Sequence, residues 1–298
     1  MSEPVSEGNY VDLHCHGGAG FYFSDQNPEN IESAIRFHRE HGSSRLLASL
    51  VSETIPNLTS QIERLLPFCN SGLLAGIHLE GPYLAKSRCC AHKPELLKTP
   101  SLDEIKSLLE VGEGFVKMVT VAPELDGALD SIRYLSTQRV IPAIGHSAGT
   151  YDDAKRAIEA GAGLVTHFSN AMSKLADGVK TFATALLYES TIPLEVIFDG
   201  HHIKDQDLKI ILDAAPDRLV FITDAMSATG QSDGDYLIGS LAVVVEDGVA
   251  RLKSNGALAG STLTMSKAVA NARKFGVSEE VVRNSSEILP RKILESAQ

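Results

Sequence analysis

Histidine is concentrated at one kind of place in this sequence. Seven of the ten histidines fall at or just past the end of a short apolar run, where the run meets a polar loop. They are His14, His16, His78, His146, His167, His201 and His202. One such histidine is more often a hydrogen-bonded core or loop residue, but a set this large is harder to explain in that way. Imidazoles that converge with a carboxylate are ligands typical of Zn²⁺ or another borderline divalent metal.

Two carboxylates occupy the same kind of position, since Glu80 ends one apolar run and Asp224 ends another. His14 and His16 stand at i and i+2, so in a strand both imidazoles point to the same side. A divalent metal held by such residues would polarise a carbonyl and lower the pKa of a water molecule to about 7. Asp224 could then take a proton and pass it to a leaving group. The pattern predicts metal-assisted hydrolysis of an amide or a similar bond.

The residues that would support covalent catalysis form a weaker pattern. No GxSxG motif occurs, and Gly260-Ser261-Thr262 is better explained as the N-cap of a helix. The cysteines follow no disulfide-scaffold spacing. Two of them, Cys89 and Cys90, are adjacent in a loop, and most cysteine pairs of this kind have no special role. The cysteines are Cys15, Cys69, Cys89 and Cys90. A reduced, cytoplasmic protein is therefore expected.

A regular alternation of apolar runs and amphipathic segments must position these residues. Eight runs are expected to form strands, at 10–14, 45–50, 73–80, 115–122, 140–146, 163–167, 193–199 and 218–224. Helices are expected between them, for example over 28–41 and 150–160. Continuous apolar strands that alternate with helices predict a parallel sheet covered on both faces. Eight units without a GxGxxG motif favour an α/β fold of the closed (β/α)8, TIM-like type.

The carboxyl ends of the strands in such a barrel meet on one face, where catalytic residues collect. The 21 residues from His146 to His167 match one strand–helix–strand repeat, which places both histidines at equivalent positions on neighbouring strands. After Asp224 the pattern changes: residues 237–253 alternate and turn at Asp247-Gly248, which predicts a β-hairpin. Helices are expected over 261–275 and again from Ser278. The prediction is one barrel over 10–298 with a hairpin insertion at about 237–253.

Composition limits the classes of partner. The chain has 298 residues, 43% of them hydrophobic, which is enough for a full core. Its 27 basic and 38 acidic residues give a net charge of −11, which argues against nucleic acid or an anionic membrane as the main partner. A small anionic substrate is not excluded, because it feels the local field of its pocket. No apolar run approaches the length of a membrane span, and the first residues lack the pattern of a signal peptide.

Several motifs together resemble the N-acetylglucosamine-6-phosphate deacetylases of the amidohydrolase superfamily. The motifs are VDLHCHGGAG (11–20), GIHLEGPYL (76–84), IGHSAGTYDDA (144–154), THFSNAM (166–172), IFDGHHI (197–203), ITDAMSATG (222–230) and GALAGSTLTM (256–265). They run in the family's order over nearly the whole chain. HLEGPYL combined with GHS and THFSNAM is specific, whereas an HxH motif alone is not.

The resemblance implies an enzyme that removes acetate from the 2-acetamido group of N-acetylglucosamine 6-phosphate and leaves glucosamine 6-phosphate. It implies Asp224 as the catalytic residue. Glu80, His146 and His167 would hold a main metal, and His14 and His16 a second one. The metal would be Zn²⁺, with Fe²⁺, Mn²⁺ or Co²⁺ as alternatives. The implied substrate contacts are Ala91, His92, Asn170, Ala171, Asp199, Gly200, His201, His202, Leu258, Ala259 and Gly260. A homodimer is also implied.

The sequence departs from the family pattern in two respects. Family members usually carry an arginine that holds the phosphate, often across a dimer interface, but Gly178 stands at that position. Lys174 or Lys180 could substitute, although a lysine cannot reproduce the bidentate fork of an arginine. The family's flanking β-sandwich is also expected to be largely missing. Two alternatives therefore stay open: a deacetylase of a different or unphosphorylated N-acetyl amino sugar, and a shortened, non-catalytic paralogue that binds sugar or metal.

Overall fold

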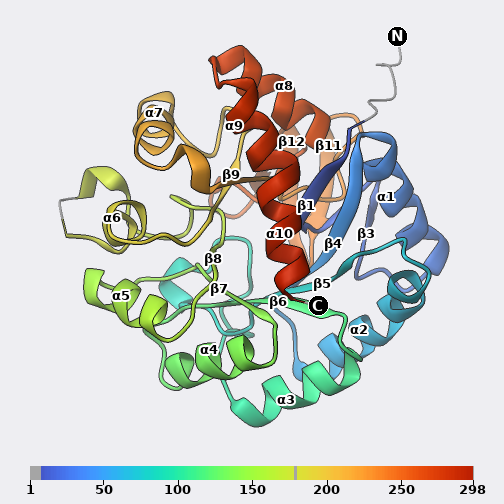
Figure 1. The fold of residues 1–298 in the computed structure, drawn as a ribbon. Coiled ribbons are helices and arrows are strands. Elements are labelled where there is room, and N and C mark those ends of the chain that lie inside the picture. Colours follow the sequence, from blue (N-terminus) through green and yellow to red (C-terminus); the bar gives the residue numbers. More distant parts are fainter. Residues whose placement is uncertain (1–7, 178–179, 298) are drawn as a thin grey trace.

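The computed structural model describes residues 8–177 and 180–297, and its main feature is an eight-stranded parallel sheet (Figure 1). The strands follow one another in chain order, and each falls within or close to one of the predicted apolar runs. They are β1 Tyr10–Cys15, β4 Ser43–Val51, β5 Gly76–Glu80, β6 Val116–Val121, β7 Ile141–Ile144, β8 Leu164–Val165, β9 Leu194–Ile197 and β10 Leu219–Ile222. All eight predicted strands are present.

The sheet closes where β1 meets the residues that follow β10. The backbone N–H of Asp224 donates to the carbonyl of His14 at 2.8 Å, and the N–H of His16 donates to the carbonyl of Ala225 at 2.8 Å. Cys15 and Ala225 form an isolated parallel bridge at the same place. This closure confirms the predicted TIM-like (β/α)8 fold and brings the two ends of the strand order into contact.

Helices surround this sheet, as Figure 1 shows. They are α1 Pro28–Glu40, α2 Ile55–Asn70, α3 Leu102–Val111, α4 Ala128–Thr137, α5 Tyr151–Glu159, α6 Phe182–Tyr188, α7 Asp205–Ala214 and α8 Met265–Phe275. Helix α1 begins after the N-cap Asn27, and α5 begins with a capping box between Thr150 and Asp153. Short elements in the connections are β2 Gly17–Gly18, β3 Phe21–Tyr22 and the 3₁₀ turns Lys86–Arg88, Leu175–Asp177 and Pro216–Arg218.

The predicted start of the helix over 261–275 is wrong by four residues. Helix α8 begins at Met265, and the side chain of Thr264 caps it by accepting from the N–H of Lys267. The backbone of Ser261 pairs in strand fashion instead: its N–H donates to the Asp224 carbonyl at 2.7 Å. Its hydroxyl donates to the Thr223 carbonyl at 2.6 Å. Because the backbone of Ser261 is paired with Asp224 in this way, the helix starts after it, and Thr264 serves as the N-cap.

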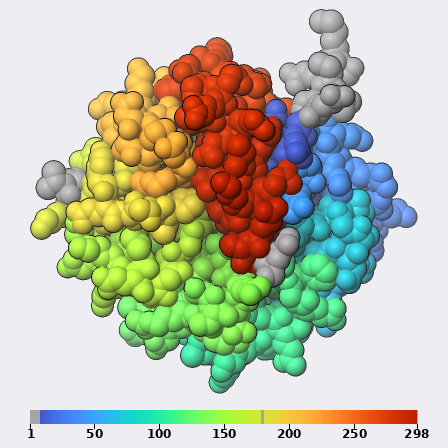
Figure 2. Space-filling view, viewed as in Figure 1, coloured from blue at the N-terminus to red at the C-terminus, as the bar shows by residue number. Residues whose placement is uncertain are grey.

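The C-terminal helices cover one end of the barrel. They are α9 Glu279–Arg283 and α10 Leu289–Ser296, joined by a π-helical turn at Asn284–Ile288. Lys117, near the start of β6, donates to the carbonyl of Ala297 at 2.9 Å, and Arg291 donates to the carbonyl of Asn9, just before β1. This end is therefore the one where the strands begin. Figure 2 views that face, with the red C-terminal segment across its centre.

A small antiparallel sheet follows β10 and is made of β11 Gly234–Ile238, β12 Leu241–Glu246 and β13 Val249–Leu252. The predicted hairpin corresponds to β12 and β13, with its turn at Asp247-Gly248, where φ is +50° and +73°. Strand β11 adds a third strand that the sequence pattern did not reveal. The sheet packs its apolar side against Met226, Ala228 and Ala259, close to the carboxyl ends of the barrel strands. The expected loss of the flanking sandwich stays a prediction.

Within the described residues, none of the helices is both long enough and apolar enough to span a membrane.

Candidate active site

Three polar residues of the site occupy equivalent places at the carboxyl ends of their strands. His146, His167 and Asp224 each stand two residues past the end of β7, β8 and β10. Each has a positive φ, of 47°, 26° and 49° respectively. A non-glycine residue in this region costs about 1–3 kcal/mol and is found mainly where function requires it. The structure thus places His146 and His167 at equivalent positions, as the spacing predicts, and adds Asp224 to them.

The first group of side chains converges on one oxygen of Glu80, the last residue of β5. Glu80 Oε1 lies 3.1 Å from His146 Nε2 and 3.0 Å from His167 Nε2. The two imidazole nitrogens are themselves 3.0 Å apart. All three side chains are buried. Three potential ligand atoms so close together form the kind of donor set that binds a divalent ion.

The second group contains His14, His16 and Asp224, whose ligand atoms also lie close together. His16 Nε2 lies 3.2 Å from His14 Nε2 and 3.2 Å from Asp224 Oδ1. It also lies 3.3 Å from Glu80 Oε2, and His14 Nε2 lies 3.5 Å from Glu80 Oε1. The Glu80 carboxylate therefore stands between the two groups: Oε1 faces His146, His167 and His14, and Oε2 faces His16.

In three histidines, a hydrogen bond at Nδ1 fixes the direction of Nε2. Each Nδ1 contacts an oxygen that can only accept, so each Nδ1 carries a proton and Nε2 remains for a proton or a metal. The contacts join His14 Nδ1 to Glu195 Oε2 at 3.1 Å, His16 Nδ1 to the Ser49 carbonyl at 3.2 Å and His146 Nδ1 to the Arg88 carbonyl at 2.8 Å. This arrangement of second contacts is typical of metal-binding histidines.

The electrostatics of the site also fit a cation. Burial by itself would lower the pKa of His16, but hydrogen bonds to Asp224 and Glu80 raise it to about 9. The pKa of His14 is held well above its ordinary value against the same effect of burial, because Glu80 and Glu195 face it. Carboxylates that stabilise a positive charge on an imidazole would stabilise a divalent ion in the same place. The side chains present therefore fit a divalent metal.

His92 differs from these three histidines in which ring nitrogen carries the proton. The backbone N–H of Ser52 donates to His92 Nδ1 at 3.2 Å, so the ring proton sits on Nε2. That Nε2 lies 3.3 Å from Glu80 Oε2. Burial lowers the pKa of His92, which favours the neutral ring. We interpret His92 as a neutral hydrogen-bond donor at the edge of the site, although its position also brings it near the ligand atoms of Glu80 and His146.

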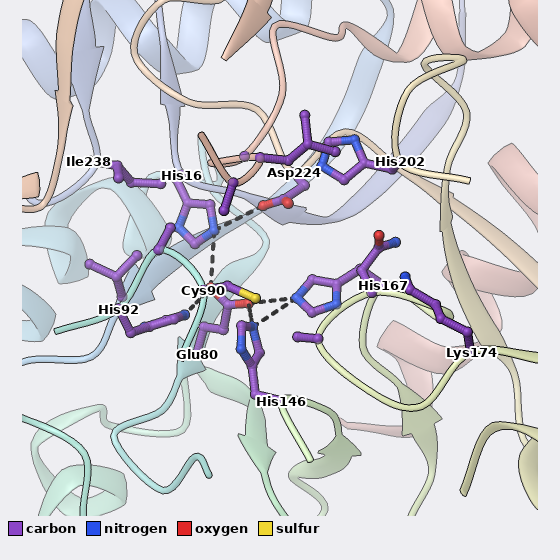
Figure 3. Close-up of a pocket in the computed structure, with 17 residues that line it drawn as sticks. His16, Glu80, Cys90, His92, His146, His167, Lys174, His202, Asp224 and Ile238 are labelled. Atoms are coloured by element: carbon purple, nitrogen blue, oxygen red, sulfur yellow. Dashed lines mark hydrogen bonds and ion pairs between the residues drawn. The ribbon is translucent and has the colours of Figure 1, made fainter. Parts of the chain in front are cut away.

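A cavity of about 220 Å³ opens onto these side chains (Figure 3). Of the implied substrate contacts, those that line it are Ala91, His92, Asn170, Ala171, His202, Leu258 and Gly260. Val51 at the end of β4, Ile238 at the end of β11 and Ala257 add apolar surface. Cys90, whose thiol has no predicted role, and Lys174 complete the lining.

The remaining implied contacts lie outside this cavity. His201 is exposed, and Ala259 is fully buried in the core of the small sheet. Asp199 accepts from the backbone N–H of His201 at 2.8 Å and from His202 Nδ1 at 2.7 Å, so it orients His202 instead of lining the cavity. Gly200 belongs to the same turn, with a φ of +82°. Gly178, the position of the family's arginine, lies outside the described residues.

Two other residues behave differently from the expectation. His78 lies inside β5, two residues before Glu80, and its nitrogens bond to Ser49 Oγ at 2.9 Å and Thr120 Oγ1 at 2.8 Å. Both of its ring nitrogens have partners in the barrel interior, and it joins neither of the two groups described above. Glu195, which orients His14, was not anticipated. Its signal in the sequence was an acidic residue in the middle of the apolar run 193–199.

The barrel and its two imidazole–carboxylate groups define a hydrolase of the metal-dependent amidohydrolase type. No model of a protein family matches the chain. The N-acetylgalactosamine-6-phosphate deacetylase of Escherichia coli O157:H7 is 33% identical over 290 residues, which are 96% of this chain and 77% of that protein. The N-acetylglucosamine-6-phosphate deacetylase of Bacillus subtilis is 32% identical over 89% of this chain and 69% of its own length.

A solved structure agrees with these sequence relatives. It is a variant of the N-acetyl-D-glucosamine-6-phosphate deacetylase from Mycobacterium smegmatis in complex with N-acetyl-D-glucosamine-6-phosphate. It superposes with a TM-score of 0.92 and 39% identity over 97% of this chain and 77% of that chain. The chain belongs to the N-acetylglucosamine-6-phosphate deacetylase family.

Proposed function

We propose that this protein hydrolyses the acetamide of N-acetylglucosamine 6-phosphate to release acetate and glucosamine 6-phosphate. The observation that carries the proposal is the position of the Glu80 carboxylate between two imidazole groups, at the base of one small cavity that also contains Asp224 and His92. The names of the related proteins support the same substrate class. The cavity volume of about 220 Å³ suits a small sugar and not a polymer.

We propose that Glu80, His146 and His167 hold the main divalent ion, and that His14 and His16 hold a second one beside it. The set of imidazoles and carboxylates is best suited to Zn²⁺, while Fe²⁺, Mn²⁺ and Co²⁺ accept similar ligands. A divalent ion there would polarise the acetamide carbonyl and make a nearby water more acidic. The protein side chains would then move the protons and hold the substrate.

Asp224 is the residue we assign to proton transfer. Burial would raise the pKa of its carboxyl, but the hydrogen bond from His16 and the charge of His14 lower it to about 2. The carboxylate is therefore ionised near neutral pH and can take a proton from the attacking water. As the C–N bond breaks, Asp224 would return this proton to the amine nitrogen, while the oxygen of the water stays on the acetyl carbon as acetate.

His92 is the residue we assign to the carbonyl oxygen of the acetamide. Its Nε2–H points toward the Glu80 side of the cavity and can donate to an oxygen on which negative charge develops. Asn170, Ala171, His202 and Leu258 line the remaining wall and would contact the sugar. We also propose a homodimer, from the family resemblance alone; the molar mass in solution, measured by light scattering, tests it.

The function is tested by acetate release from N-acetylglucosamine 6-phosphate, before and after treatment with a chelator, with metal analysis of the same sample. We expect one or two divalent ions per chain, turnover in the untreated sample and loss of turnover on chelation, with recovery when Zn²⁺ is added. A protein that binds metal and sugar but releases no acetate would instead support the non-catalytic paralogue.

A second candidate substrate is N-acetylgalactosamine 6-phosphate, because the 33% identical relative from Escherichia coli O157:H7 is named for it. The two sugars differ only in configuration at C4, away from the acetamide. Measurement of kcat/KM for both epimers decides between them. The epimer with the higher kcat/KM identifies the substrate for which the sugar wall of the cavity is built.

A further inference from the structure

The cavity contains one basic side chain that the proposed chemistry does not use. Of the described residues that line it, Lys174 is the one lysine or arginine, and the remaining charged residues are Glu80 and Asp224. The chain as a whole carries a net charge of −11. A lysine at this wall therefore creates a local positive field in a protein that otherwise repels anions.

The structure holds Lys174 in place by its backbone and by its amine. Its backbone N–H donates to Asp177 Oδ2 at 2.7 Å, and its Nζ donates to the carbonyl of Ser169, whose φ is +69°. Across residues 8–177 and 180–297, no carboxylate oxygen lies within ion-pair distance of this Nζ. The ammonium thus keeps hydrogen-bonding capacity and an unneutralised charge.

The position of Lys174 relative to the reacting end of the site is informative. Figure 3 shows Lys174 and His202 on the side of the cavity opposite His92 and Ile238, with the amino end of Lys174 directed inward. The acetamide would lie against Glu80, Asp224 and His92. The 6-substituent of the same sugar must therefore point away from them, and a phosphate there would need a cation.

We propose that Lys174 binds the phosphate of the sugar substrate and does so from the same chain that supplies the metal-binding residues. This inference rests on the proposed function. Gly178 offers no side chain at the position where the family resemblance implies an arginine, so the positive charge must come from elsewhere. His202, oriented by Asp199 through Nδ1, presents its other ring nitrogen as a second contact.

The lysine also has the chemical character that the role requires. Lys174 is exposed as a whole residue; partial burial of its amine lowers the pKa, while Cys90 and Asp207 act in the opposite direction. A phosphate dianion beside it would favour the charged form further. A lysine is a point charge on a flexible stem, so its contact with phosphate does not need the fixed geometry of an arginine fork.

The test is the selectivity for the phosphorylated sugar over the free sugar. Lys174→Ala should lower kcat/KM for N-acetylglucosamine 6-phosphate by about 10- to 100-fold, mainly through KM, because one charge-assisted hydrogen bond is lost. Its kcat/KM for N-acetylglucosamine should stay within about twofold of the wild-type value. Inorganic phosphate, used as a competitive inhibitor, should bind more weakly to the variant. Lys174→Arg should retain most of the selectivity.

Lys180→Ala is the matched control, since Lys180 is exposed in the same loop, as Lys174 is, but its Nζ lies 5.9 Å from the ring centroid of Tyr151 and the residue is not part of the cavity lining. It should leave both kinetic constants and phosphate inhibition unchanged. The proposal is wrong if Lys174→Ala keeps its selectivity, if it lowers turnover of both sugars equally, or if Lys180→Ala has the same effect. A wild-type protein that turns over neither sugar would overturn the proposed function, and this inference with it.

Discussion

The carboxylate of Glu195 accepts a hydrogen bond from His14 Nδ1 at 3.1 Å, deep inside the barrel. The same Oε2 also accepts from the backbone N–H of His167 at 3.1 Å. Glu195 is 0% exposed, and its Oε1 has no hydrogen-bond partner in the part of the chain that the structure describes. A buried carboxylate with an unsatisfied oxygen is costly unless positive charge lies nearby. Glu195 therefore ties strand β9 to both proposed metal sites.

Glu195→Gln should weaken binding at the second metal site more than at the first. The amide still fills the space, but it removes the negative charge that orients His14 and raises the pKa of its ring. Loss of such an outer contact typically costs about 10- to 100-fold in metal affinity. Metal analysis after dialysis against limiting Zn²⁺ should show fewer ions per chain. Glu110→Gln, an exposed helical position, is the control, and equal metal content in both variants would contradict the role.

Asp224→Asn should lower kcat by about 10²- to 10⁴-fold, because a carboxamide cannot accept the proton that a carboxylate takes from water. The metal content should stay close to that of the wild type, since Glu80 and four imidazoles remain. Acetate release and metal analysis on one preparation check both parts. A variant that keeps its turnover would remove Asp224 from proton transfer, and one that loses its metal would identify it mainly as a ligand.

His92→Asn separates two roles for the imidazole. If its Nε2–H donates to the acetamide oxygen, the variant should lose about 10²- to 10³-fold in kcat while its metal content is unchanged. If His92 instead acts as a ligand with Glu80 and His146, metal content should fall in parallel with turnover. The contact from the Ser52 N–H to Nδ1 favours the first outcome, because it leaves the proton on Nε2.

Removal of the metal should also lower stability. The folded chain brings the side chains of two ligand groups together, and an ion that binds only the folded state stabilises it in proportion to the logarithm of its concentration. At a Zn²⁺ concentration of about 1,000 Kd this amounts to about 4 kcal/mol. Thermal unfolding of chelated protein, with and without added Zn²⁺, measures the effect. Equal Tm values in both samples would contradict the assignment of the site.

The sequence predicts the barrel and most of the site because both depend on short-range patterns. Each apolar run of the right length becomes a strand, and a polar residue just past its end is carried to one face of the barrel. His146 and His167 follow this rule, and the structure places them at equivalent positions. The start of α8 could not be predicted in the same way, because Ser261 is held by a backbone partner, Asp224, that is distant in the sequence.

Spacing in the sequence predicts the role of a residue less well when its partners come from other strands. His78 fits the pattern of a site residue, yet Ser49 and Thr120 from neighbouring strands satisfy both of its nitrogens. Glu195 is a single acidic residue in an apolar run, and its role depends on facing His14 across the barrel. Whether a side chain of a short strand points into or out of the barrel depends on the register of the closed sheet. The sequence of one strand does not reveal that register.

A histidine outside the proposed metal sites makes the stability of the fold sensitive to acid. His38 of α1 is 0% exposed, and its Nε2 donates to the carbonyl of Gly17 at 2.8 Å. Burial lowers its pKa to about 4, while the hydrogen bond to Gly17 opposes this shift and His41 adds to it. In the unfolded chain the ordinary value of about 6.5 applies. Below about pH 6.5 the unfolded chain therefore binds a proton that the folded chain does not.

His38→Gln should remove this part of the pH dependence. The stability that neutral His38 confers is complete above about pH 6.5 and is lost as the pH falls toward 4, by about 3 kcal/mol in total. Glutamine can still donate to the Gly17 carbonyl but does not titrate, so the free energy of unfolding should fall less between about pH 7 and about pH 5 than in the wild type. Urea unfolding of both chains, with exposed His201→Gln as the control, measures the difference. The comparison uses slopes with pH, so it stays valid even if the substitution lowers stability at every pH. Parallel slopes would show that folding does not lower the pKa of His38.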